Sequence, residues 1–135
     1  MKKTAKTILS ALGCERASLS LLFTDDPVIH VLNRRWLKRD RPTDVISWAA
    51  EETGPRDFLG DIAISIDTAV RQAAELGHSL DDELARLLIH GILHLRGHDH
   101  VRGGKKAAAM RMEEERLWAT LASAGLKKTK VKGSA

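Results

Sequence analysis

The chain has a single cysteine and no long apolar run, and these two absences exclude two classes of protein. Cys14 has no second cysteine to pair with, so the chain cannot form an intrachain disulfide and is not a disulfide-stapled secreted domain. A helix that crosses a bilayer needs roughly 20 consecutive apolar residues, and no segment approaches that length. We therefore expect a cytoplasmic protein with no membrane partner.

Aromatic residues are also scarce. The 135 residues include no tyrosine, two phenylalanines and three tryptophans. Proteins that bind single-stranded nucleic acid by stacking rely on exposed aromatic side chains, so no such stacking platform is expected here. We assign Trp36 and Trp48 to the hydrophobic core instead.

Positive charge, by contrast, is in excess and gathers in one segment. The formal net charge is +4. Residues 34–41 hold a run of cations opposed only by Asp40: Arg34, Arg35, Lys38, Arg39 and Arg41. Such a run is either an ordinary solvated helix face and turn or a surface that binds a polyanion. The charge pattern alone leaves both interpretations open.

The length allows one domain with one hydrophobic core. We place this domain at residues 1–125. Residues 126–135 hold four lysines and end in Gly-Ser-Ala, so we expect a basic, disordered tail there.

Hydrophobic periodicity and capping residues predict an α+β fold. We expect strands at 17–23, 44–49 and 59–66, and the short connection between the last two, with Gly54 and Pro55, favours an antiparallel pair. Helices are expected at the N-terminus, after Pro27, from Asp67 as cap to Gly77, from Ser79 as cap to about Leu95, and after Gly103-Gly104. The sum is a small mixed β-sheet with helices packed over it.

Three histidines near the end of the fourth predicted helix point to a metal site. His90 and His94 lie one helical turn apart and point the same way, so both imidazoles can reach one ion. Gly97 can adopt a positive φ, end the helix and turn the chain back, which would bring His100 up as a third ligand. Three imidazoles leave the fourth tetrahedral position for water, as in catalytic zinc sites.

This donor set predicts one Zn²⁺ per chain, with nickel, cobalt and iron as competitors. The alternative is that His90 and His94 are only half-buried helix residues, and it does not explain a third histidine placed after a turn glycine. His30 and His78 lie outside the motif, and we expect both at the surface.

The histidine spacing equals that of the metzincin proteases, His-Glu-x-x-His-x-x-Gly-x-x-His. The glutamate that serves those proteases as general base is Gly91 in this chain. Glycine cannot accept a proton, so a peptidase of that kind would lose its base while the metal site stays intact.

The same segment resembles the signature of the bacterial YbeY family, the zinc-dependent rRNA maturation endoribonucleases. It reads His90-Gly91-x-Leu93-His94-Leu95-x-Gly97-x-Asp99-His100. The segments 42–48 (Pro-Thr-Asp-Val-Ile-Ser-Trp) and 59–62 (Leu-Gly-Asp-Ile) are similar to two strand motifs of that family, in the same order. The resemblance covers roughly residues 19–121.

The resemblance implies a zincin-like hydrolase with a zinc-binding helix, whose zinc ligands are His90, His94 and His100. It implies metal-dependent cleavage of single-stranded RNA in the maturation of ribosomal RNA, notably at the small-subunit 3′ end, and in ribosome quality control. Ribosomal RNA, the ribosome and ribosome-associated proteins are the implied partners. Two alternatives stay open: a metal-dependent peptidase or other hydrolase with its base elsewhere, and a non-catalytic, zinc-containing ribosome-assembly factor.

One departure from the family concerns Leu37, which stands where members have an arginine that faces the metal cleft. Leucine cannot bind phosphate. Either a neighbouring cation such as Arg34, Lys38 or Arg41 makes the phosphate contacts, or catalysis is weakened.

The sequence does not identify the proton acceptor of the reaction. Asp61 is the candidate to approach the metal, with capping or hydrogen bonding at a strand end as its alternative role. Asp99 is placed to orient a ligand histidine, with an ordinary solvated position as the alternative.

Overall fold

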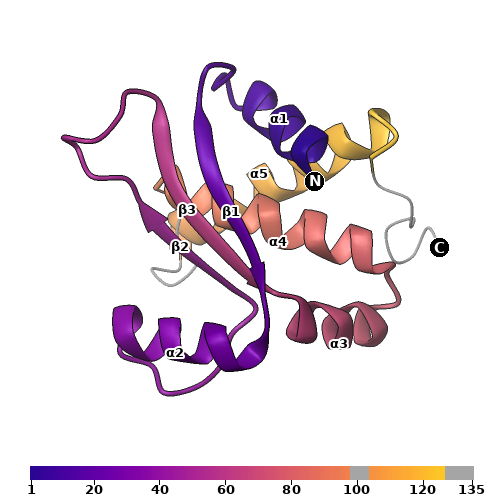
Figure 1. The fold of residues 1–135 in the computed structure, drawn as a ribbon. Coiled ribbons are helices and arrows are strands. Elements are labelled where there is room, and N and C mark those ends of the chain that lie inside the picture. Colours follow the sequence, from indigo (N-terminus) through magenta and orange to yellow (C-terminus); the bar gives the residue numbers. More distant parts are fainter. Residues whose placement is uncertain (98–103, 127–135) are drawn as a thin grey trace.

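The computed structural model describes residues 1–97 and 104–126 and has the predicted α+β architecture (Figure 1). Its elements, in chain order, are α1 (Lys2–Ala11), β1 (Ser18–Thr24), α2 (Asp26–Leu37), β2 (Val45–Ala49), β3 (Phe58–Ser65), α3 (Ile66–Leu76), α4 (Leu80–Leu95) and α5 (Gly104–Ser123). Every predicted strand and helix is present. In the part of the chain that the structure describes, no helix combines the length with the apolar character needed to cross a membrane.

The three strands form one mixed sheet in the order β1-β3-β2. β1 runs parallel to the central strand β3, and β2 runs antiparallel to it, as the short connection predicted. Side chains alternate between the faces of a strand. Ile62 and Ile64 of β3 are fully buried on one face, whereas Asp61 is exposed on the other.

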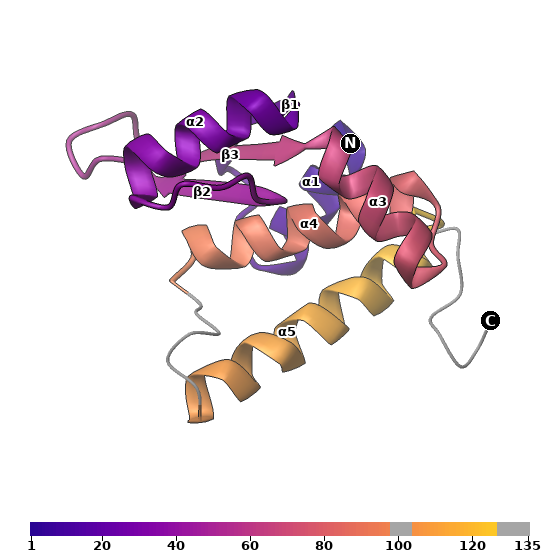
Figure 2. The same ribbon diagram turned by 90° about the horizontal axis from the view of Figure 1, so that it is seen from below.

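The helices form layers on both faces of this sheet. Figure 2 shows α2 over one face and α4 against the other, with α5 beyond α4. α4 is therefore the central helix, and it is buried along most of its length, for example at Leu88 and Ile92. Met110 and Leu117 of α5 close the core on the far side of α4.

The N-termini of α2 and α3 are tied together by polar side chains. Ser65, not the predicted Asp67, caps α3, because it precedes the first helical residue and its hydroxyl accepts from the Thr68 N–H at 3.3 Å. Asp67 lies in the first turn, and its carboxylate accepts instead from the backbone N–H of Asp26 at 3.0 Å. Hydrogen bonds from Ser65 and Thr68, and the guanidinium of Arg71, lower the pKa of Asp26 to about 2.

The assignment of Trp36 and Trp48 to the core is wrong. Trp36 is 56% exposed, and Trp48 is half-buried. The reason is that α2 turns Ile29 and Asn33 toward the protein interior. The Asn33 side chain donates to the Arg41 carbonyl at 2.8 Å, and Trp36 lies outside the core when this face of the helix points inward.

The prediction that His78 lies at the surface also needs correction. His78 is half-buried, because its ring packs 6.0 Å from that of Trp118 and its Nε2 lies 3.8 Å from the buried carboxylate of Glu83. His30 is partly exposed and pairs with Asp40 at 2.8 Å.

Candidate metal centre

The structure brings His90 and His94 together at the C-terminal end of α4. Their Nε2 atoms lie 3.1 Å apart, and their ring centroids lie 4.5 Å apart. The helix ends at Leu95, and Gly97 has the positive φ, +92°, that the sequence predicted for a turn glycine. His98, Asp99 and His100 lie outside the described residues.

The geometry of the histidine pair fits a zinc ion. In a tetrahedral site with Zn–N bonds of about 2.0–2.1 Å, two nitrogen ligands lie about 3.3–3.4 Å apart, close to the observed 3.1 Å. Residues 1–97 and 104–126 bring no three metal-ligating side chains together. If three protein ligands hold a metal here, the third comes from outside these ranges, and His100 stays the predicted one.

A carboxylate from α5 stands behind the first of these histidines. Glu114 Oε2 lies 3.3 Å from His90 Nδ1. A carboxylate at this distance favours the tautomer in which Nδ1 carries the proton, so the lone pair of Nε2 is left for a metal. Both side chains are mostly buried, with exposed fractions of 30% for His90 and 29% for Glu114, which strengthens the contact.

Glu114 was missed from the sequence, although one signal for it was present. The buried stripe of α5 consists of Ala107, Met110, Leu117 and Leu121. Glu114 falls into this stripe, four residues after Met110 and three before Leu117, where an apolar residue is expected. An acidic residue in a buried helix stripe indicates a polar partner on the facing element.

Glu114→Gln is expected to weaken zinc binding by about 10- to 100-fold, the usual effect of removing the partner of a ligand histidine. The amide keeps the shape but loses the negative charge that makes the imidazole a better ligand. Competition against a zinc-binding dye measures the affinity. Glu115→Gln, the same change at the exposed neighbouring position, is the matched control and should bind zinc as the wild type does. Equal affinities for the two variants would contradict the role of Glu114.

Gly91 lies in close contact with the sheet. A Cβ at this position would lie 3.1 Å from two side-chain carbons of Ile62 and 3.3 Å from Ser47 Oγ. The Ser47 hydroxyl also donates to the Gly91 carbonyl at 3.3 Å, which joins β2 to α4. A glutamate at this position, as in the metzincin proteases, would therefore crowd Ile62 and Ser47.

One turn before His90, the same helix carries a partly buried ion pair. Arg86 Nε donates to Glu83 Oε1 at 2.8 Å, and a second guanidinium nitrogen reaches Glu83 Oε2 at 2.5 Å. Glu83 is fully buried, and its carboxylate raises the pKa of Arg86. This bidentate pair neutralises the buried Glu83 carboxylate one turn before His90.

Comparison with known proteins decides which family this site belongs to. The sequence model of the family described as Endoribonuclease YbeY matches residues 1–122. The chain belongs to this family. Endoribonuclease YbeY of Aquifex aeolicus is 47% identical over 92% of this chain and 83% of its own length. The protein of the same description from Geobacter metallireducens is 47% identical over 93% of this chain and 87% of its own length.

A solved structure supports the fold of this YbeY family member. The solution structure of TM1509 from Thermotoga maritima superposes with a TM-score of 0.58 at 24% sequence identity. The match covers 96% of this chain and 86% of that one. At this level of identity, the likeness concerns the fold alone.

The structure does not bring Asp61 to the histidine pair of the YbeY motif. Ile62 contacts α4 at Gly91, and neighbouring side chains of a strand point to opposite faces. Asp61 therefore lies on the face covered by α2, where it lines a cavity together with Leu32 and Trp36. The hypothesis that Asp61 approaches the metal does not agree with this placement.

The cations assigned to phosphate contacts lie at the C-terminal end of α2 and in the segment after it. Arg34, Lys38 and Arg41 are all exposed, and Arg34 lies 3.9 Å from Asp40. Leu37, at the position of the YbeY arginine, is the last residue of α2 and is 44% exposed. The three cations are thus accessible to a polyanion, and their contacts with phosphate stay a prediction.

Proposed function

We propose that this chain is a zinc-dependent endoribonuclease that cuts single-stranded RNA in the cytoplasm during the maturation of ribosomal RNA, notably at the small-subunit 3′ end, and in ribosome quality control. The observation that carries the proposal is the pair of Nε2 atoms 3.1 Å apart, with a carboxylate behind one ring, in a member of the Endoribonuclease YbeY family. Ribosomal RNA, the ribosome and ribosome-associated proteins are the proposed partners.

Each group of the site has a part in this proposal. His90 and His94, with His100 as third ligand, would hold one zinc ion. Bound there, zinc would supply an electrophile that polarises a phosphoryl oxygen and activates water near neutral pH. Glu114 keeps His90 in the tautomer that binds metal. The exposed cations after α2 would hold flanking phosphates, giving an affinity that depends on salt and little on sequence.

Two alternatives use the same histidines. A peptidase is disfavoured because the position of its base is a glycine packed against Ile62 and Ser47. A non-catalytic assembly factor that keeps zinc for folding is favoured by one observation, namely that Leu37 replaces the arginine expected in the family.

Metal removal separates these three functions. We expect the purified protein to contain one zinc per chain and to cut a single-stranded ribosomal RNA precursor fragment. Chelation should abolish the cleavage, and added zinc should restore it, with metal content followed by mass spectrometry. Zinc binding without RNA cleavage would instead support the assembly factor. Hydrolysis of casein without RNA cleavage would support the peptidase.

A further inference from the structure

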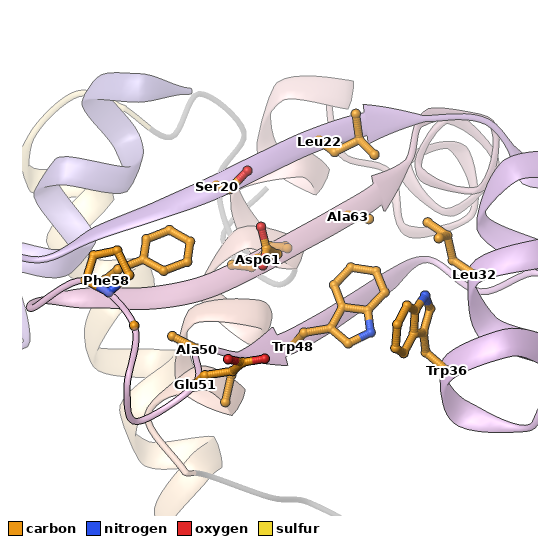
Figure 3. Close-up of a pocket in the computed structure, with 14 residues that line it drawn as sticks. Ser20, Leu22, Leu32, Trp36, Trp48, Ala50, Glu51, Phe58, Asp61 and Ala63 are labelled. Atoms are coloured by element: carbon orange, nitrogen blue, oxygen red, sulfur yellow. The ribbon is translucent and has the colours of Figure 1, made fainter.

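The face of the sheet away from the histidines carries a cavity of about 790 Å³. Its floor is a row of three side chains, one from each strand. Asp61 of β3 is the register partner of Ser20 on β1 and of Trp48 on β2, so all three side chains point to the same face. Figure 3 shows this row, with Leu32 and Trp36 of α2 opposite it.

The Asp61 carboxylate is unusual in this setting. Most of the cavity lining is apolar, including Leu22, Leu32 and Ala63. Among the described residues, no group forms a hydrogen bond or ion pair with the side-chain carboxylate of Asp61, which is exposed to solvent. An acceptor with free lone pairs at the base of an apolar hollow fits a ligand that brings N–H donors on an otherwise flat, apolar body.

Trp36 supplies an aromatic wall to the same cavity. Its ring meets Trp48 edge to face at 6.5 Å and is 56% exposed. The guanidinium of Arg35 lies 5.7 Å from the ring centroid. A large indole left open to solvent inside a hollow is a surface on which another ring can stack.

The cavity lining itself carries two carboxylates, Asp61 and Glu51, and the nearby cations lie beside it, on α2 and in the segment that follows. Arg34 and Arg35 belong to the same helix as Trp36, and Lys38, Arg39 and Arg41 follow directly. All five are exposed. An aromatic wall, a hydrogen-bond acceptor and adjacent cations together complement a nucleotide, which combines a flat base that carries N–H groups with a phosphate.

We propose that this cavity binds one unpaired nucleobase of an RNA strand. The base stacks on Trp36, its N–H edge faces Asp61, and the cations at the end of α2 neutralise the neighbouring phosphates. The identity of the ligand as RNA rests on the proposed function. Because β2 is an edge strand, an RNA strand can pass around it and contact both this face and the face that carries α4.

Asp61 gives the cavity a preference among bases. Guanine offers two adjacent N–H donors on its Watson–Crick edge, which a carboxylate can accept together. Uracil offers one N–H between two carbonyl oxygens, and these repel a carboxylate. The cavity should therefore bind guanine more tightly than uracil.

Tryptophan fluorescence tests the proposal without any cleavage step. Trp118→Phe removes the one tryptophan outside the cavity, so the remaining emission comes from Trp36 and Trp48. In a His94→Ala background, which is designed not to cut, we titrate a uridine pentanucleotide and the same pentamer with a central guanosine. We expect saturable quenching with both and a lower Kd for the guanosine pentamer.

Single substitutions then identify the contacts. Trp36→Ala should raise the Kd about tenfold or more, as expected for the loss of one stacked base, and Trp36→Phe should restore most of the affinity. Asp61→Asn should remove the preference for guanosine. Leu76→Ala, at an apolar position of α3 with similar exposure (49%), is the matched control. Fluorescence anisotropy of labelled pentamers repeats the measurement without the Trp118→Phe change.

Two results would overturn the proposal. One is a Trp36→Ala protein that binds both pentamers with the same Kd as the Leu76→Ala protein. The cavity would then not bind a nucleobase, and contact with another protein would be its remaining role. The other is an Asp61→Asn protein that still prefers guanosine. If the wild-type chain fails to cut RNA but these affinities change as expected, the proposed function fails and the nucleobase site stands.

Discussion

Replacing His94 by alanine is expected to abolish zinc binding and RNA cleavage together. The substitution removes one of the two nitrogens that lie 3.1 Å apart, and at most two predicted ligands remain. We expect zinc content to fall from one per chain to near zero, and the cleavage rate to fall by at least about 100-fold, since the metal supplies the electrophile. The fold should persist, because His94 is only half-buried and alanine favours a helix.

His78→Gln is a suitable control for this experiment. His78 is also a half-buried histidine, but it lies before α4 and packs against Trp118. The His78→Gln protein should retain both zinc binding and RNA cleavage. A His94→Ala protein that contains no zinc and still cuts single-stranded RNA would contradict the proposed mechanism. Full zinc content with lost cleavage would contradict the assignment of His94 as a ligand.

The sequence predicted the elements of the fold because their signals are local. Ser79 caps α4 through the Asp82 N–H at 3.1 Å, three residues away, and the alternation of Ile62 and Ile64 marks one face of β3. The side of α2 that faces the core was not predictable in this way. Val28, Leu32 and Trp36 form an apolar stripe at helical spacing, yet Val28 is 44% exposed. The face that points inward is instead that of Ile29 and Asn33, and the Asn33 side chain bonds to the Arg41 carbonyl outside the helix.

The candidate metal centre likewise has one part that depends on local sequence and one part that depends on tertiary packing. The approach of His90 and His94 follows from their spacing of four residues in a helix. Glu114 comes from a different helix, 24 residues further along the chain, so its contact with His90 required the packing of α5 on α4. The position of Asp61 was within reach of sequence reasoning. The alternation of Ile62 and Ile64 along the sequence implies that Asp61 points to the opposite face of the strand.

Gly91→Glu would restore the complete metzincin pattern, and we expect it to destabilise the fold without creating a peptidase. The new side chain would start 3.1 Å from two side-chain carbons of Ile62, which is 1% exposed. It would also place a carboxylate in the interface between α4 and the sheet, away from water. Overpacking of this kind costs about 1–3 kcal/mol, and burial of the charged group adds to it, so we expect a loss of at least about 3 kcal/mol.

Urea unfolding of the metal-free protein measures this loss, because bound zinc would add its own stabilisation. Ala119→Glu introduces the same side chain at an exposed position of α5 and should change the stability by no more than about 0.5 kcal/mol. Gly91→Ala should lie between the two, because the better helix propensity of alanine, about 1 kcal/mol, offsets part of the close contact. A Gly91→Glu protein that is as stable as Ala119→Glu and hydrolyses casein would show that the sheet leaves room for a general base. The glycine would then differ from the peptidase glutamate in chemistry alone. The contacts with Ile62 and Ser47 would not exclude a larger side chain at this position.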